Sequence, residues 1–275
     1  MKKKPLRRII RSIKIVVALA YYLISYFTAG AVRQFGRRKN AALTILNYHS
    51  VKDEQLKKFQ KQMERLKRAG EPFFADQACP LFGRTHFIAL TFDDGFKNVV
   101  ENALPVLRKL RIPATLFVPV GHLGCLPGWI NDPLHENAGE ALMSAGQLKG
   151  LPKDLIKIGS HSVTHHVLPE LAQEQALFEL CESKRLLETI TGRKITLLSF
   201  PYDIYSSRDL EMAKEAGYTK VFSGSLIFGS DDFLTGRVDV STSDWKIEYW
   251  LKLRGAYNWV PLVRGIRFRL ISIFK

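Results

Sequence analysis

Short apolar runs recur along residues 41–245, and stretches with apolar residues at helical spacing separate them. The runs have the length of strands and predict buried strands at 43–48, 87–92, 114–118, 155–158, 195–200 and 220–223. The spaced stretches predict helices at 54–69, 96–110, 171–190 and 207–216. Strands that alternate with helices in this way form a mainly parallel sheet with helical crossovers, so we expect an α/β fold.

Polar residues collect directly after the carboxyl ends of the predicted strands, where parallel barrels and open α/β sheets build their sites. Residues 121–150 interrupt the alternation, since they are rich in Gly and Pro and predict a long loop with one short helix. Loops of this length are usually functional or mobile.

Residues 15–32 form a run of eighteen residues without charge, with seven cations before it and four after it. A helix over this run would span about 27 Å, just short of a hydrocarbon core of about 30 Å. The run predicts a single-span membrane anchor, and the cations weakly favour a cytoplasmic N-terminus. A helix lying in the membrane interface and a signal peptide cleaved near residues 29–31 are the alternatives.

The chain has 275 residues and a net charge of +15, which is concentrated at its two ends. Residues 1–40 hold eleven Lys or Arg and no acid, and residues 246–275 hold seven with one Glu, which leaves residues 41–245 with a charge of −2. Basic ends beside apolar stretches favour an anionic membrane surface as partner, whereas nucleic-acid enzymes more often spread cations over a binding face. With 46% hydrophobic and 24% charged residues, a disordered chain, a collagen and a multi-span membrane protein are excluded.

These patterns predict three parts: a membrane-anchor segment at 1–40, one domain at 41–245 and a basic amphipathic tail at 246–275. The tail is expected either to pack on the domain as a helix that starts after Trp245 or to lie on a membrane. The three cysteines lack CxxC spacing and cannot form a closed disulfide framework, so we expect small apolar fillers.

Two groups of residues could carry chemistry. Asp93 and Asp94 end a predicted strand, and Gly95 permits a turn, although Asp-Gly is also a common plain turn. His161 and His165 are four residues apart, so on one helical turn or in a tight loop both imidazoles can face one point. A carboxylate and two imidazoles suit zinc or a similar divalent ion and leave positions for water, which the spare carboxylate can deprotonate.

Four segments resemble the motifs of the polysaccharide deacetylases, the NodB-homology family or carbohydrate esterase family four. TFDDG at 91–95 looks like the first motif, HSVTH at 161–165 matches the second motif H[ST]xxH, and Pro-Tyr at 201–202 fits the third motif RxPYG. LNYH at 46–49 resembles the motif LxH, which normally comes last. Its early position resembles the circularly permuted branch that includes poly-N-acetylglucosamine deacetylases.

The resemblance implies a distorted (β/α) barrel of the NodB-homology type and a divalent metal, with zinc expected first and cobalt, nickel or manganese as alternatives. The ligands carried over from the family motifs are Asp94, His161 and His165. Asp93 would be the general base, His49 the general acid for the leaving amine, and the backbone N–H of Tyr202 part of the oxyanion site. Amide hydrolysis needs an activated water, a stabilised oxyanion and a protonated leaving group.

The sequence also departs from the family pattern. Ser199 stands where many members have the Arg that orients the base, and Asp203 stands where Gly is usual. We expect Arg237 to supply a cation instead. Residues 241–245 resemble the fourth motif DxxDW with Ser first, so Trp245 is expected to line an acyl pocket or to belong to the core.

These features predict a metal-dependent hydrolase that removes N-acetyl groups from a cell-surface or membrane-linked glycan. Tethering to a membrane also allows a deformylase or other deacylase of a lipid-linked aminosugar, and the missing Arg allows a non-catalytic glycan-binding barrel. We expect a location at the inner (cytoplasmic) membrane, on either side, and no nucleic-acid partner. The sugar, the acyl group and the metal stay open, because a fold does not determine its substrate.

Overall fold

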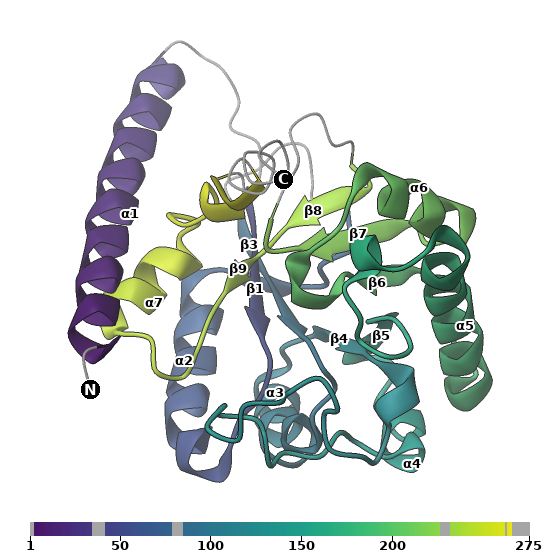
Figure 1. Ribbon diagram of the computed structural model, residues 1–275. Coiled ribbons are helices and arrows are strands. Elements are labelled where there is room, and N and C mark those ends of the chain that lie inside the picture. The colour runs from purple at the N-terminus through teal and green to yellow at the C-terminus, as the bar shows by residue number, and fades with distance from the viewer. Residues whose placement is uncertain (1–2, 35–41, 79–84, 226–231, 262, 266–275) are drawn as a thin grey trace.

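The computed structural model describes residues 3–34, 42–78, 85–225, 232–261 and 263–265 (Figure 1). Its strands are β1 (Ala42–Tyr48), β2 (Glu71–Phe73), β3 (His86–Phe92), β4 (Ala114–Val118), β5 (Ile156–Ser160), β6 (Leu197–Ser199), β7 (Lys220–Ser223), β8 (Leu234–Gly236) and β9 (Val238–Asp239). Its α-helices are α1 (Lys3–Gln34), α2 (Leu56–Ala69), α3 (Leu104–Leu110), α4 (Ala145–Lys149), α5 (Gln173–Thr191), α6 (Ser207–Glu215) and α7 (Lys246–Leu253).

The strands form one parallel sheet in the order β8-β7-β6-β5-β4-β3-β1-β9, with β2 beside the first half of β3. The two ends of this order meet in one short segment. β8 pairs with β7, in the register Phe222 with Thr235, and β9 pairs with β1, in the register Asn47 with Asp239. Arg237 is the single residue between β8 and β9, so the sheet curls into a nearly closed barrel with Arg237 at the seam. The predicted α/β barrel is confirmed.

All of the predicted strands and helices are present, and the strands that the sequence did not predict are short. The strand at 114–118 and the strand at 220–223 have the bounds expected, and the helix expected at 96–110 contains a π-helical turn at Val99–Ala103 ahead of α3. The sequence did not predict β2, β8 or β9, because two or three residues are too few to show a period.

Successive side chains along the strands point to opposite faces of the sheet and divide the core into two layers. Five of them form an apolar cluster inside the barrel: Ile45, Ala89, Phe117, Leu197 and Phe222. Their strand neighbours, such as Leu46, Leu90 and Leu198, belong to a larger cluster that packs against the helices. This is the two-residue period of a strand buried on both faces, and it leaves an apolar plug beneath the carboxyl end of the barrel.

The apolar run at 15–32 lies in α1, which stands along the side of the barrel next to α7 (Figure 1). The structure does not describe the side chains of residues 26 and 28–34. Within the described residues, no helix is long and apolar enough to cross a membrane. The expectation of a membrane-spanning anchor therefore finds no support in this part of the chain.

The expected helix after Trp245 is present as α7, and its side chains Tyr249, Leu251 and Leu253 are buried. Packing on the barrel therefore holds for this part of the basic tail. The alternative, in which the tail at 246–275 lies on a membrane, stays a prediction for residues 262 and 266–275, which lie outside the described residues.

Gly159 on β5 leaves room for the ring of Phe117 on β4. A Cβ atom at residue 159 would lie 2.5 Å from two ring carbons of Phe117 and 3.0 Å from the carbonyl oxygen of Leu197. We expect Gly159→Ala to lower the free energy of unfolding by about 1–3 kcal/mol, since an overpacked core must shift. Urea denaturation measures this. Gly139→Ala is the control, because a Cβ there meets nothing within 4 Å, and equal losses in the two variants would contradict the packing described.

Candidate active site

Asp93 and Asp94 are adjacent, yet both carboxylates line one cavity of about 420 Å³. Asp94 has a φ of 67° and Gly95 a φ of 64°, so the chain turns through the left-handed region immediately after β3. Both Asp side chains are buried, at 4% and 6% exposure. The turn expected at Gly95 therefore brings both carboxylates to one place, which a continuing strand would not do.

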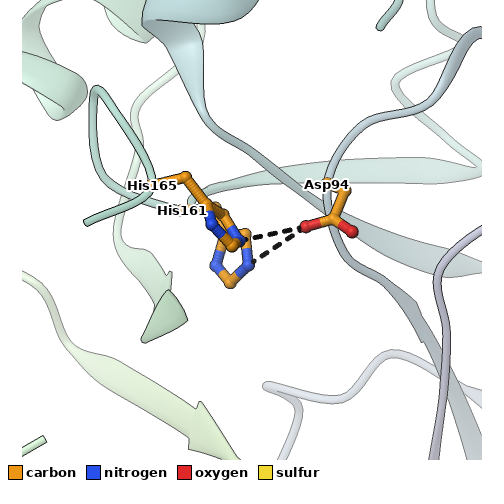
Figure 2. Close-up of side chains that lie close together, drawn as sticks. All are labelled: Asp94, His161 and His165. Atoms are coloured by element: carbon orange, nitrogen blue, oxygen red, sulfur yellow. Dashed lines mark ion pairs between the residues drawn. The ribbon is translucent and has the colours of Figure 1, made fainter. Parts of the chain in front are cut away.

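The three predicted metal ligands come together in this cavity (Figure 2). Asp94, His161 and His165 each offer one ligand atom, and these atoms lie within 4.8 Å of one another. Nε2 of His161 lies 3.6 Å from Oδ1 of Asp94, and Nε2 of His165 lies 3.2 Å from it. Ligand atoms about 2.0–2.2 Å from a tetrahedral zinc ion are roughly 3.3–3.6 Å apart. The arrangement therefore fits one divalent ion.

His161 is held in the form that a metal needs. Its Nδ1 lies 2.7 Å from the carbonyl oxygen of Ser199 and donates a hydrogen bond to it, so Nε2 is free to act as a ligand. Burial lowers the pKa of His161 to about 4, which keeps the ring neutral near neutral pH. Such a bond to the second ring nitrogen is the usual way in which a protein orients a metal-binding imidazole.

His165 is held by aromatic rings. It lies in the loop after β5 with a φ of 62°, so the two histidines share a tight loop and no helical turn. The indole of Trp129 stacks on its imidazole with centroids 4.1 Å apart, and the ring of Tyr202 meets it edge-on at 4.7 Å. Nδ1 of His165 is buried and has no hydrogen-bond partner among the described residues. Stacking by Trp129 therefore orients this ring, a role that no sequence pattern in the long loop indicated.

Asp93 belongs to a buried network that Arg237 completes. Nη1 of Arg237 donates to Oδ1 of Asp93 at 2.8 Å, Nη2 donates to Oδ2, and the amide of Asn47 donates to Oδ2 at 3.1 Å. Burial by itself would raise the pKa of Asp93, but the charge and hydrogen bonds of Arg237, together with His161 and His49, outweigh this and hold the pKa below its usual value. Asp93 is therefore a fixed carboxylate that points into the cavity without being part of the three-ligand group.

His49 follows β1 and lines the same cavity. The pairing of β1 with both β3 and β9 carries it there, although it precedes the other site residues in the sequence. Loss of surrounding water lowers its pKa, but the negative charges of Asp94, Asp93 and Asp239 outweigh this and raise the pKa. The geometry thus brings together every residue that the sequence predicted for proton transfer and metal binding.

A family model described as polysaccharide deacetylase matches residues 83–221, which is just over half of the chain. The chain belongs to the polysaccharide deacetylase family. A poly-beta-1,6-N-acetyl-D-glucosamine N-deacetylase of Staphylococcus aureus (strain MRSA252) is 25% identical over 164 residues, which are 55% of this chain and 53% of the relative. YxkH of Bacillus subtilis (strain 168) is 27% identical over 191 residues, which are 66% of this chain and 63% of the relative. The chain thus spans between half and two thirds of the length of these relatives.

Solved structures show the same fold. IcaB from Ammonifex degensii matches with a TM-score of 0.64 at 22% identity, covering 80% of this chain and 98% of that one. The Streptococcus pyogenes deacetylase PplD matches with a TM-score of 0.61 at 17% identity, covering 79% and 99%. At these identities the two structures show that the fold is shared.

The structure accounts for the two departures from the third polysaccharide deacetylase motif. Ser199 is small, so the Arg237 guanidinium reaches past it and donates from Nη2 to its Oγ at 2.6 Å. The cation expected from Arg237 therefore arrives from the barrel seam. Asp203 keeps a left-handed φ of 58°, the conformation that explains the usual Gly, and its Oδ1 accepts from Nη2 of Arg237 at 3.5 Å and from the N–H of Gly224 at 2.6 Å.

Two aromatic residues of the deacetylase motifs lie in different places. Tyr202 is at the cavity wall with a φ of 59° and half of its surface exposed. Trp245 is not among the described residues that line the cavity and is 42% exposed, so neither the acyl-pocket place nor the core place expected for it finds support here. It precedes α7 and lies under the guanidinium of Arg11, which is 4.9 Å from its ring centroid. The indole that lines the cavity is that of Trp129.

Replacing either imidazole of the three-ligand group should weaken metal binding. We expect His161→Ala and His165→Ala each to lower the affinity for zinc by more than the roughly 10–100-fold that loss of an outer partner costs. His166→Ala is the matched control, since His166 contacts Thr164 and does not line the cavity. Metal content after dialysis against a graded chelator measures the affinity, and stoichiometric zinc in both His161 and His165 variants would refute the assignment.

Removing the cation beside Asp93 should destabilise the protein strongly. Arg237→Met leaves a buried carboxylate unpaired, which costs about 3–5 kcal/mol of unfolding free energy. Adding Asp93→Asn should restore part of that loss. The control is Arg264→Met, because Arg264 is 42% exposed and pairs with Asp239, and such pairs contribute at most about 1 kcal/mol. Equal losses at residues 237 and 264 in urea denaturation would contradict the buried network.

Proposed function

We propose that this protein is a metal-dependent N-deacetylase that acts on poly-N-acetylglucosamine or a related glycan. One observation carries the proposal: a single cavity holds two adjacent carboxylates with different partners, Asp94 beside His161 and His165, and Asp93 beside Arg237. The name of the Staphylococcus aureus relative supplies the substrate class.

Asp94, His161 and His165 would hold the metal. Two imidazole nitrogens and one carboxylate oxygen, with a neutral His161, are a donor set for zinc, and cobalt, nickel or manganese are the alternatives. When bound, such an ion supplies a Lewis acid and lowers the pKa of a coordinated water.

The remaining residues would divide the proton transfers. Asp93, fixed by Arg237, accepts a proton from the attacking water as the new carbon–oxygen bond forms. His49 donates a proton to the leaving nitrogen as the carbon–nitrogen bond breaks, and its raised pKa favours the protonated form that this step requires. The backbone N–H of Tyr202 contributes to stabilising the oxyanion. The products are a free amine on the sugar and a carboxylate such as acetate.

The apolar surface of α1 favours a variant of this activity. Exposed side chains such as Val16, at 66%, make a membrane-linked glycan or a lipid-linked aminosugar the second candidate substrate, with formyl as the second candidate acyl group. A protein that acts on such a substrate would be located at the inner membrane. A non-catalytic glycan-binding barrel is disfavoured, because a binder would not require Asp93, Asp94 and His49 in one cavity.

Asp93→Asn and His49→Ala should each reduce turnover by about 10²–10⁴-fold, the contribution of a general base or acid. Both variants should keep stoichiometric metal, since neither residue belongs to the three-ligand group. The measurement is acetate release from poly-β-1,6-N-acetylglucosamine by the full chain, with His166→Ala as control. Unchanged turnover in either variant would remove that residue from the mechanism.

The same assay tests the function itself. We expect acetate release that a chelator abolishes and added zinc restores. Mass spectrometry of the treated glycan separates loss of acetyl from loss of formyl. Absence of any released acid from this polymer and from lipid-linked aminosugars, with metal bound, would overturn the proposed activity.

A further inference from the structure

One face of α1 is fastened to the barrel. Ala18 is fully buried in a cluster with Val238, Leu251, Ala256 and Tyr257. Four of the five side chains come from the barrel seam and the segment that contains α7. The middle of α1 is therefore part of a packed core.

Polar and aromatic contacts extend this attachment along the helix. Arg11 pairs with Glu248, approaches Asp244 at 3.5 Å and donates to the carbonyl oxygen of Ser243 at 2.9 Å. Farther along α1, the ring of Tyr22 meets that of Trp250 edge-on at 5.3 Å. From residue 11 to residue 22 the helix makes about three turns. It lies against the body over this whole length.

The opposite face of α1 is apolar and exposed. At about 100° per residue, the positions opposite Ala18 are those of Ile9, Ile13, Val16 and Ala20. Ile9 is 56% exposed, Ile13 57% and Val16 66%. The flanking Val17, Leu19 and Leu23 are also at least 40% exposed; we call these seven residues the outer face of α1. A soluble helix normally shows the reverse arrangement, with its apolar stripe turned to the core.

The outer face is bracketed by positive charge. Residues 2–14 hold seven cations and residues 33–39 hold four, and residues 1–40 contain no acid. Apolar side chains that enter the boundary between headgroups and acyl chains, with cations beside lipid phosphates, are the pattern of a helix in a membrane interface.

We propose that α1, held against the barrel by α7, docks the protein onto anionic lipid bilayers through its outer face, lying in the plane of the interface. A second copy of the chain is the rival occupant. Two outer faces in a symmetric pair would place cationic ends beside cationic ends, which is repulsive, whereas phosphate headgroups neutralise them. The inference does not depend on the proposed enzymatic activity.

Vesicle co-sedimentation of the full chain tests the proposal. We expect binding to phosphatidylcholine vesicles that contain phosphatidylglycerol, and much weaker binding without it. Ile13→Asp with Val16→Asp should weaken binding at least about tenfold, because two apolar side chains no longer enter the bilayer. Leu126→Asp with Phe178→Asp is the matched control, since both are exposed apolar residues of the barrel. Equal binding by the two double variants would overturn the proposal.

Two further measurements separate the other arrangements. In sedimentation without lipid, the unmodified chain and the double variant Ile13→Asp with Val16→Asp should have the same molar mass. A dimer of the unmodified chain that this variant dissociates, together with absence of vesicle binding, would assign the outer face to a second copy. In a background without the native cysteines, Tyr22→Cys with Trp250→Cys should be joined by a bismaleimide cross-linker both in solution and in the vesicle-bound protein, because the two side chains are neighbours. A cross-link that forms in solution and is lost in the vesicle-bound protein would mean that α1 leaves α7 in the membrane, which contradicts docking in the interface. Absence of the cross-link in solution would contradict the contact between α1 and α7.

Discussion

The buried ion pair between Asp93 and Arg237 is the interaction on which the rest of the site depends. Both side chains are almost without exposure, and burying two charges is repaid only when their geometry and hydrogen bonds are good. Arg237 meets this condition because it sits between β8 and β9, where the sheet closes, and points across the barrel end. Asn47 and Ser199 take up its neighbouring hydrogen bonds. Closure of the barrel thus also fixes the position of Asp93, the proposed base.

The pair also explains how two adjacent carboxylates can have the two different roles proposed for them. Asp93 is paired with the buried guanidinium of Arg237, whereas Asp94 faces two imidazoles. Environments that differ in this way are how enzymes assign different work to like groups. The left-handed turn at Asp94 and Gly95 makes the division possible, since it brings both carboxylates to one cavity.

Most of the strands and the candidate site residues could be predicted from the sequence, whereas short strands and contacts between distant segments could not. Apolar runs predicted β4 and β7 with their bounds, and short motifs pointed to Asp93, Asp94, His161, His165 and His49. The strands β8 and β9 were missed because they have three and two residues, and with them the seam that explains why Arg237 can replace the absent Arg. Trp129 lies in a long irregular loop without a period, so its stacking on His165 needed the structure. The contact of Trp245 with Arg11, more than 200 residues away in the sequence, also needed the structure, because no motif indicates it.

We propose that Asp94 is a metal ligand while Arg237 keeps Asp93 free as the base. Anomalous diffraction at the zinc edge, from crystals of the full chain grown with zinc, tests it most directly. We expect one peak about 2.0–2.2 Å from Nε2 of His161, Nε2 of His165 and a carboxylate oxygen of Asp94, with the Asp93–Arg237 pair intact. A peak coordinated by Asp93, or no peak at this position, would contradict it.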